Sequence, residues 1–247
     1  MGQLIRQGQV ALDQVRITDP KQHIRLEDAA RLTVSGSPFI PRRHLHYILH
    51  KPVGVLSATQ DPHEPVASDF LPEETRTRKL VPVGRLDKDS EGLLFFTNDG
   101  QLNHRLTSPK HRVAKHYLVD LELLLASGTT RTEGLNATDV AAFAAGTLRL
   151  DDKDLLPAEL EILDPWQGHV VLYEGRYRQV RRMFELLGLK VRRLQRVREA
   201  GLELGNLAAG DCRMLTDAEA TALYEHVGLD DPDATWRRLA PQTDAEP

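Results

Sequence analysis

The chain has 247 residues, of which 40% are hydrophobic and 28% are charged, and its formal net charge is −4. This composition is typical of a globular protein and excludes disordered and membrane-spanning classes. No apolar run approaches the roughly 20 residues of a membrane helix, and no signal-peptide core begins the chain. We therefore expect a cytoplasmic monomer without a membrane partner. The single cysteine, Cys212, excludes an internal disulfide and a cysteine-rich zinc site.

Residues 1–39 are polar and rich in turns, and we expect them to form a small separate domain. Within it, residues 4–12 resemble the latter half of an S4-type RNA-binding domain, where a basic helix ends at a glycine and a strand follows. Met1 falls inside that expected fold, so we expect either a start further upstream or a reduced domain. Residues 1–37 are expected to be loosely attached or partly disordered. Residues 40–45 are predicted to be a linker, because prolines and arginines interrupt any regular pattern.

Residues 46–228 are predicted to form one α+β domain with a mixed, mainly antiparallel sheet, because adjacent strands dominate and no βαβ rhythm is present. Residues 229–247 are predicted to be a disordered acidic tail. The predicted strands are His46–His50, Leu80–Val83, Leu93–Thr97, Tyr117–Leu121, Leu160–Leu163, Val170–Tyr173 and Val191–Val197. The predicted helices are Val140–Ala145, a segment with Val180, Met183, Phe184 and Leu187 on its apolar face, and a helix capped by Thr216 that reaches Glu225.

The segment from Gly84 to Gly100 is the most informative part of the chain. It places the carboxylate of Asp87 on a loop that leads into an apolar strand, and Asp99-Gly100 is predicted to be the turn after that strand. A reactive group is well presented on a loop that strands hold on both sides. A solvated loop charge is the alternative reading from spacing alone.

Four motifs resemble, in order, those of the pseudouridine synthases of the RsuA type. They are Lys51-Pro52-Val53-Gly54, the run Gly84-Arg85-Leu86-Asp87 with Gly92-Leu93-Leu94 and Thr97-Asn98-Asp99-Gly100, then Lys115-His116-Tyr117, and Glu174-Gly175-Arg176-Tyr177-Arg178-Gln179-Val180-Arg181-Arg182-Met183. The resemblance covers about residues 46–216 and implies the fold of that family. It also implies conversion of a uridine in RNA to pseudouridine without a cofactor. The segments 104–109 and 153–155 resemble most the branch that acts on small-subunit (16S) ribosomal RNA.

The resemblance implies three catalytic residues. Asp87 would be the carboxylate close to C1′ of the target uridine, and Arg181 would supply the cation that keeps it ionised. Tyr117 would pack its ring on the uracil. From the residues alone, Arg181 could equally contact phosphate from the helix surface, and Tyr117 could be a core residue of its strand. The histidines His44, His46 and His50 have no Cys or acidic partner nearby, so no metal site is expected.

Basic residues flank these motifs, with nine Lys or Arg against one acid between Arg176 and Arg198. Such a stripe suits a groove that follows RNA phosphates, although a solvated helix face is the alternative. Arg85 is expected to fill the stack vacated by the flipped uridine or to hold a phosphate, with a structural salt bridge as the alternative. The other predicted RNA-binding residues are Lys51, Lys115, Arg176, Arg178, Gln179, Arg182, Arg192 and Arg193.

The expected partner is ribosomal RNA, preferably 16S, or a ribosome assembly intermediate. Three alternatives remain from the sequence. The first is a synthase acting on 23S ribosomal RNA, and the second is a non-catalytic RNA-binding or ribosome-assembly factor on the same fold. The third is a sugar-cleaving hydrolase, which would need a second carboxylate such as Asp89 or Glu91.

Overall fold

The computed structural model of the protein describes residues 2–39, 42–124 and 130–234. These residues form two compact units. One consists of residues 2–39 and 42–44 together with 230–234, and the other consists of residues 45–124 and 130–229. Within the described residues, no helix has the length and apolar character required to span a bilayer.

The first unit has a small sheet and a hydrophobic core of its own. The strands pair in the order β2, β1, β3, β4, and the core is made by Ile5, Val10, Ile17, Ala29 and Leu32. Its elements are α1 (Gly2–Arg6), β1 (Val10–Leu12), β2 (Val15–Arg16), a 3₁₀ helix (Leu26–Arg31), β3 (Leu32–Val34) and β4 (Ser37–Pro38).

The chain remains ordered further toward its C-terminus than we expected. Asp233 is 2% exposed, and its carboxylate accepts a hydrogen bond of 3.1 Å from the backbone N–H of Arg43. This contact ties residues 230–234 to the first unit and corrects the predicted start of the acidic tail at residue 229. The rest of that predicted tail, residues 235–247, lies outside the described residues.

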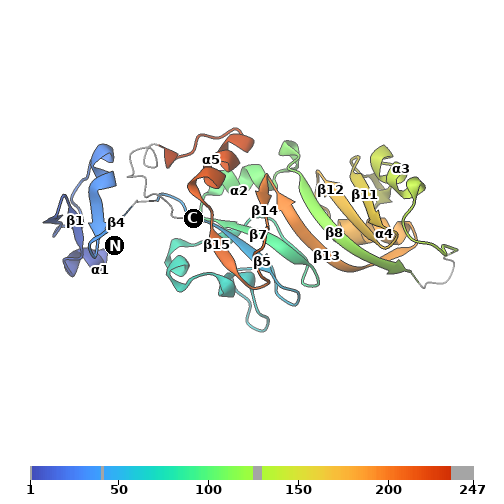
Figure 1. Cartoon of the computed structure of the whole chain (residues 1–247), viewed down its shortest axis with the longest axis horizontal. Coiled ribbons are helices and arrows are strands. Elements are labelled where there is room, and N and C mark those ends of the chain that lie inside the picture. The colour runs from blue at the N-terminus through green and yellow to red at the C-terminus, as the bar shows by residue number, and fades with distance from the viewer. Residues whose placement is uncertain (1, 40–41, 125–129, 235–247) are drawn as a thin grey trace. The chain divides into compact units, whose positions relative to one another are not determined.

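The second unit is an α+β domain built on one large sheet, as predicted (Figure 1). The described strands follow the order β11, β12, β8, β13, β7, β5, β15, and β14 and β6 pair with β13 and β7. All of these pairings are antiparallel except the one between β13 and β7. The strands are β5 (His46–Lys51), β6 (Val81–Pro82), β7 (Glu91–Thr97), β8 (Lys115–Leu123), β11 (Glu159–Asp164), β12 (Gln167–Leu172), β13 (Leu189–Glu199), β14 (Leu202–Glu203) and β15 (Cys212–Met214).

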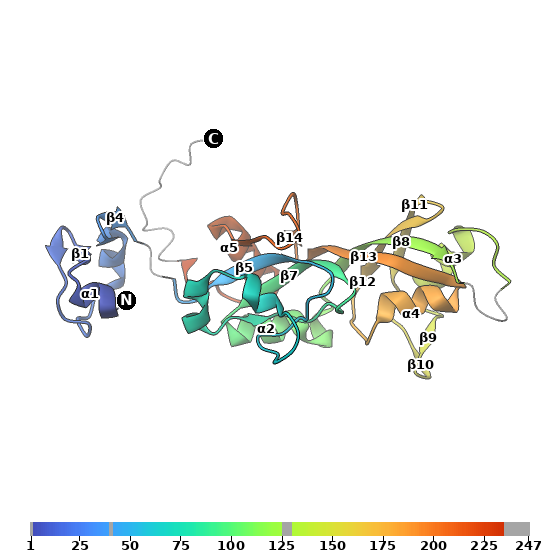
Figure 2. The same ribbon diagram turned by 90° about the horizontal axis from the view of Figure 1, so that it is seen from below.

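Helices cover the sheet at both ends, and α4 lies along β13 next to a small hairpin of β9 and β10 (Figure 2). The helices are α2 (Gly100–Thr107), α3 (Ala137–Ala145), α4 (Gln179–Leu186) and α5 (Asp217–His226), and the hairpin strands are β9 (Arg149–Leu150) and β10 (Lys153–Asp154). Three short 3₁₀ helices span Ala67–Phe70, Glu73–Arg78 and Pro109–His111.

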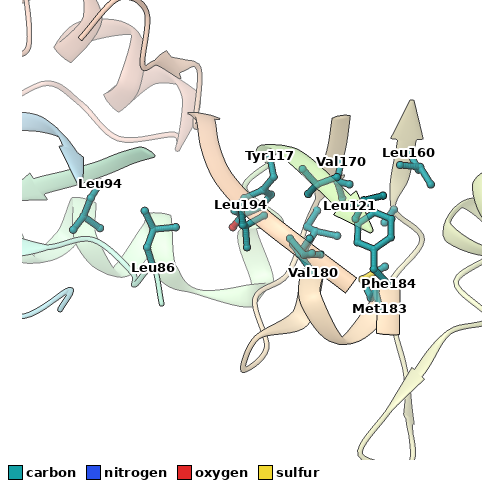
Figure 3. Packing of buried hydrophobic residues seen from close by; sticks show 14 of the residues in the cluster. Leu86, Leu94, Tyr117, Leu121, Leu160, Val170, Val180, Met183, Phe184 and Leu194 are labelled. Carbon is teal, nitrogen blue, oxygen red and sulfur yellow. The ribbon is translucent and has the colours of Figure 1, made fainter. Parts of the chain in front are cut away.

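The core is divided by the sheet into two clusters. Successive strand residues point to opposite faces, so Leu94 and Phe96 of β7 join one cluster while Leu93 and Phe95 join the other. The first cluster extends under α4, where Phe184 packs among residues of β8 and β12 (Figure 3). The second lies beneath α2 and α5. Both faces of the central strands are therefore buried, which stabilises the position of these strands in the sheet.

The parallel pairing of β13 with β7 depends on Gly92. Gly92 lies opposite Arg196, and a Cβ atom on it would lie 2.2 Å from the carbonyl oxygen of that residue. Its φ of +108° is also one that other residues rarely adopt. Only glycine permits this approach, which brings the loop before β7 against the middle of β13.

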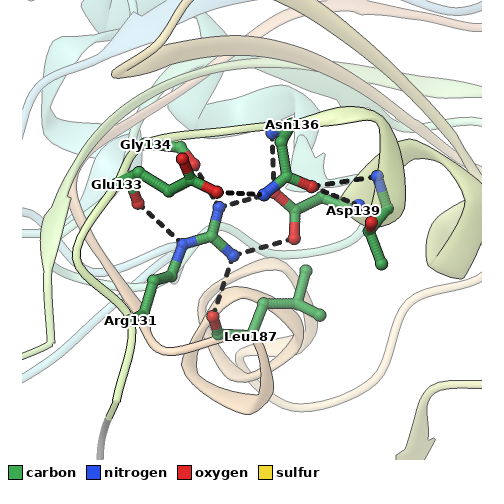
Figure 4. Close-up of polar contacts among 7 residues, drawn as sticks. Arg131, Glu133, Gly134, Asn136, Asp139 and Leu187 are labelled. Atoms are coloured by element: carbon green, nitrogen blue, oxygen red, sulfur yellow. Dashed lines mark hydrogen bonds and ion pairs between the residues drawn. The ribbon is translucent and has the colours of Figure 1, made fainter.

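Helix α4 is held at its C-terminal end by Arg131 (Figure 4). One guanidinium nitrogen donates to the Leu187 carbonyl at 3.0 Å and to the carboxylate of Asp139 at 2.8 Å, and a second contacts that carboxylate at 2.6 Å. Asp139 lies in the first turn of α3, which Asn136 caps. The buried pair thus joins the start of α3 to the end of α4.

The predicted turn at Asp99-Gly100 was wrong. The Asp99 carboxylate accepts hydrogen bonds from the backbone N–H groups of Gln101 and Leu102, at 2.8 and 3.1 Å. It therefore caps the N-terminus of α2, a helix that we did not predict. The predicted cap of the last helix is confirmed, since the Thr216 hydroxyl accepts from the backbone N–H of Glu219 at 3.2 Å.

Candidate active site

A pocket of about 530 Å³ opens between the loop before β7, strands β8 and β13, and the segment that leads into α4. Its volume lies in the range of typical ligand sites. Asp87 and Tyr117 both line it. Five of the predicted RNA-binding residues also line it, namely Arg85, Lys115, Arg176, Arg178 and Gln179.

The loop that carries Asp87 is fixed by its backbone. Ser57 donates its hydroxyl to the Leu86 carbonyl at 2.8 Å and accepts from the Leu86 N–H at 2.9 Å. Gly54 donates its N–H to the Lys88 carbonyl at 2.7 Å. In contrast, the Asp87 carboxylate has no hydrogen bond or ion pair with any residue that the structure describes. It is half-buried and faces the pocket with its oxygens available.

Asp89, two residues later, is the carboxylate of this loop that arginines hold. Arg178 donates two hydrogen bonds to it, of 3.1 and 2.8 Å. The Arg181 Nε atom lies 3.4 Å from the same carboxylate. Burial acts to raise the pKa of Asp89, but the hydrogen bond from Arg178 and the charges of both arginines hold it below the usual range.

Arg181 is buried, and its contacts differ from those that we expected. Its guanidinium donates to the carbonyls of Asp89 and Val191, each at 2.8 Å. No hydrogen bond between Arg181 and the Asp87 carboxylate is present among the described residues, and the alternative of a phosphate contact from the helix surface is incompatible with this burial. Arg181 instead joins the Asp87 loop to β13 and α4, since its own side chain belongs to the first turn of that helix.

Tyr117 lies on β8 with its ring in the hydrophobic core and one part on the pocket wall (Figure 3). Its antiparallel partner on β13 is Arg196. Burial raises the pKa of the Tyr117 hydroxyl above its ordinary value, while the positive charge of Arg196 opposes that rise. Tyr117 is therefore a core residue of its strand that also lines the pocket.

Arg196 and Glu199 are pocket residues that the sequence did not reveal. Arg196 is 1% exposed, donates from Nε to the Leu93 carbonyl at 2.8 Å, and lies 3.1 Å from Glu199. Glu199 in turn lies 3.7 Å from the amine of Lys115. Burial lowers the pKa of Lys115, against the attraction of Glu199. These charges form a buried network beneath Tyr117.

Lys51 does not face solvent, which corrects its predicted role in RNA binding. Its side chain is fully buried at 0% exposure, and its amine donates to the carbonyls of Pro52 and Val55, each at 2.9 Å. Burial is the main cause that lowers its pKa from 10.5 to about 8. Lys51 therefore shapes the turn whose Gly54 supports the Asp87 loop.

The basic stripe is largely compensated by acids, most of which come from distant parts of the sequence. All of the predicted RNA-binding arginines except Arg85 have a carboxylate partner, and that of Arg178 is Asp89, as described above. The other pairs are Arg176 with Glu174 at 3.2 Å, Arg182 with Asp151 at 2.6 Å, Arg192 with Glu122 at 3.5 Å and Arg193 with Glu91 at 2.6 Å. Arg182, Arg192 and Arg193 lie outside the pocket lining. Arg85 is exposed at the pocket and has no ion pair with a described residue.

The histidines of the β5 region have partners within the fold. The His46 ring lies 3.0 Å from the Thr97 hydroxyl, and the His50 ring lies 2.7 Å from the Leu207 carbonyl. Over the described ranges, no cluster of three or more His, Cys, Asp or Glu side chains has a geometry that could hold a metal ion.

Comparison with known proteins identifies the family. The model of the RNA pseudouridylate synthase family matches residues 45–186. The chain is 38% identical over 225 residues to the ribosomal small subunit pseudouridine synthase A of Salmonella typhimurium, covering 90% of this chain and 92% of the relative. The chain belongs to the RNA pseudouridine synthases. The resemblance inferred from the motifs is thereby confirmed, and the protein is an isomerase.

Other relatives agree with this family membership. The synthase A of Escherichia coli K12 is 41% identical over 180 residues, which cover 72% of this chain and 73% of the relative. The uncharacterized RNA pseudouridine synthase YtzG of Bacillus subtilis is 36% identical and covers 90% of both chains. A crystal structure of a pseudouridylate synthase superposes with a TM-score of 0.64 at 33% identity and covers 90% of this chain and 91% of that one. The similarity to that solved structure thus covers 90% of the chain, and the family model matches residues within the second unit.

Proposed function

We propose that this pseudouridine synthase acts on one uridine of 16S ribosomal RNA and that Asp87 is its catalytic carboxylate. The observation that carries the proposal is the geometry of the loop. Its backbone is held at Leu86 and Lys88, while the Asp87 carboxylate faces a 530 Å³ pocket without a partner among the described residues. A carboxylate that the protein does not neutralise is available to a substrate.

The reaction requires a carboxylate at the sugar. The C1′–N1 bond of the uridine breaks, the base turns, and C5 joins C1′. C5 loses its proton and N1 gains one, so no atom is added and no redox change occurs. Asp87 would act at C1′, where electron deficiency develops as the first bond breaks. The rigid loop would keep its oxygens at that carbon while the base moves.

Tyr117 and its neighbours would form the base-binding wall. The ring of Tyr117 would pack on the uracil. The Tyr117 hydroxyl would then serve as a polar or proton-handling group beside the base. Arg196 would position that ring from below, since it is fixed to β7 through the Leu93 carbonyl and to Glu199 by an ion pair. Lys115 would extend this network toward the pocket mouth.

A uridine in folded RNA must leave its stack to reach this pocket, at a cost of a few kcal/mol. Arg85, exposed at the mouth, would fill the vacated position or hold a phosphate. Arg176 and Arg178 would contact the backbone of the same strand, although each is now paired with a carboxylate. The first unit would bind RNA as an S4-like domain, and the protein would act in the cytoplasm.

The preference for 16S ribosomal RNA is supported by the relatives. Those from Salmonella typhimurium and Escherichia coli are named for the small ribosomal subunit. The hydrolase alternative is disfavoured by the ion pairs of the two candidate acids, because Asp89 is bound by Arg178 and Glu91 by Arg193. Neither acid is free to act as the second carboxylate that glycoside hydrolysis requires.

Modification mapping tests the proposal. Transcripts of 16S and 23S ribosomal RNA are incubated separately with the purified protein and with Asp87→Asn, and pseudouridines are mapped in each. We expect one new pseudouridine in 16S RNA that is absent with the variant. A pseudouridine only in 23S RNA would reject the small-subunit target. Binding of either RNA without any modification would instead indicate a non-catalytic assembly factor.

A further inference from the structure

Tyr177 is the most exposed of the large apolar side chains that the structure describes, at 77%. It nevertheless lines the pocket that holds Asp87, from the segment that leads into α4. An aromatic ring so exposed contributes little to the stability of the fold, because burial of apolar surface is what stabilises. Its place at the pocket mouth points to a ligand.

The backbone around Tyr177 is fixed, so the ring projects from a defined place on the surface. Residues 176–179 form a tight turn, in which Gln179 donates its N–H to the Arg176 carbonyl at 3.2 Å. The Gln179 side chain closes the same turn, since its oxygen accepts from the Arg176 N–H at 2.9 Å. Tyr177 occupies the first corner of this turn, where its side chain projects away from the protein.

Side chains on both sides of Tyr177 anchor the turn. The Arg176 guanidinium donates to the Asp154 carbonyl at 2.7 Å, which ties the turn to the β9–β10 hairpin. The Arg178 guanidinium holds Asp89, which ties it to the Asp87 loop. A ring presented in this way loses little conformational freedom when it binds a flat partner.

We propose that Tyr177 is a stacking platform for the nucleobase next to the target uridine in the RNA. This inference rests on the proposed function, which places the flipped uridine in the pocket. The neighbouring nucleotide must then lie at the pocket mouth, where Tyr177 is exposed. A nucleobase offers a flat face whatever its sequence, and its stacking on an aromatic ring adds affinity without a specific hydrogen bond.

Three variants of Tyr177 test the role of the ring, each made in the Asp87→Asn background so that binding is measured without turnover. Tyr177→Phe keeps the aromatic face, and Tyr177→Leu and Tyr177→Ala remove it. We expect the affinity for a 16S RNA transcript to stay within about twofold for Phe and to fall at least about fivefold for Leu and Ala. Trp166→Ala is the matched control, because Trp166 is an exposed aromatic outside the pocket lining.

A fluorescent base provides a direct readout. A fragment of 16S RNA carries 2-aminopurine on either side of the mapped uridine, and stacking on Tyr177 should quench one of the two positions. We expect the quenching to persist with Phe and to be lost with Leu. Equal affinity and equal fluorescence for Phe and Leu, with a wild-type enzyme that modifies the RNA, would overturn this inference alone. Failure of the wild-type enzyme to bind or modify the RNA would overturn the proposed function with it.

Discussion

Tyr117 of β8 and Arg196 of β13 are antiparallel partners in the sheet, and both line the pocket that Asp87 faces. Directly opposed side chains of an antiparallel pair lie on one face with their Cβ atoms about 5 Å apart. The guanidinium of Arg196 is further tied to Leu93 and Glu199. Arg196 therefore presents a buried positive charge, held in place by these contacts, next to Tyr117.

Tyr117→Phe should distinguish the contribution of the ring from that of the hydroxyl. The phenyl ring keeps the stacking face and the core packing, so we expect RNA affinity to change by less than about twofold. The single-turnover rate should fall by about 10²-fold or more if the hydroxyl handles a proton. Rapid-quench measurement at saturating RNA gives the rate, and filter binding gives the affinity. Loss of affinity with an unchanged rate would make Tyr117 a packing residue only.

Arg196→Met should destabilise the fold strongly, because it leaves Glu199 buried without its main partner. Breaking a buried pair of this kind costs about 3–5 kcal/mol. The matched control is Arg213→Met, whose partner Glu219 is partly exposed, and we expect a cost of about 1–2 kcal/mol there. Urea unfolding of both variants measures the two costs. Similar values for the two arginines would show that Arg196 is not a structural charge of the core.

Lys51→Met should leave the electrostatic part of RNA binding unchanged, because the buried amine contacts only backbone carbonyls. Removing a true phosphate contact lowers the slope of log affinity against log salt by about 1. We expect no such change for Lys51→Met but a slower single-turnover step, since the turn that supports the Asp87 loop is disturbed. Arg85→Met is the comparison in which the slope should fall. An equal fall for Lys51 would restore its predicted role.

The pair of Arg213 and Glu219 should stabilise the fold only above strongly acidic pH. The hydrogen bonds from Arg213 and the cap at Thr216 lower the pKa of Glu219 from 4.5 to about 2. A carboxyl group with a lowered pKa in the folded state contributes stability above its unfolded pKa, and that stability is lost as the pH falls through the folded pKa. The difference in unfolding free energy between wild type and Arg213→Met should therefore shrink by roughly half between pH 6 and pH 3. A difference that is constant over this interval would contradict the assignment.

The strands were predicted well because they follow from local periodicity, and the resemblance of the motifs implied the fold of the catalytic domain. The predicted strand Val191–Val197 is the centre of β13, which extends from Leu189 to Glu199. The Asp99-Gly100 pair was misread because an Asp before a Gly suits both a turn and a helix cap. The contact from Tyr224, whose hydroxyl donates to Asp99 at 2.6 Å, is a tertiary feature that local spacing does not indicate.

The electrostatics of the site could not be predicted to the same extent. The nine basic residues from Arg176 to Arg198 suggested one positive stripe, yet acids such as Asp151 and Glu91 reach them from distant segments. Arg196 belonged to a strand that alternates Arg with apolar residues, which is the usual pattern of a solvated face. Irregular register on either side of it turns its side chain inward. That burial depends on the close approach at Gly92, which no local pattern indicates.

The most direct test of the central claim is the single-turnover rate of Asp87→Asn on 16S ribosomal RNA, measured by tritium release from RNA labelled at uridine C5. The amide keeps the size of the carboxylate, and Asp87 has no hydrogen-bond partner among the described residues that its loss would leave unsatisfied. We therefore predict wild-type stability, RNA affinity within about threefold, and a rate below detection. A rate within about tenfold of wild type would contradict the assignment of Asp87 as the catalytic carboxylate.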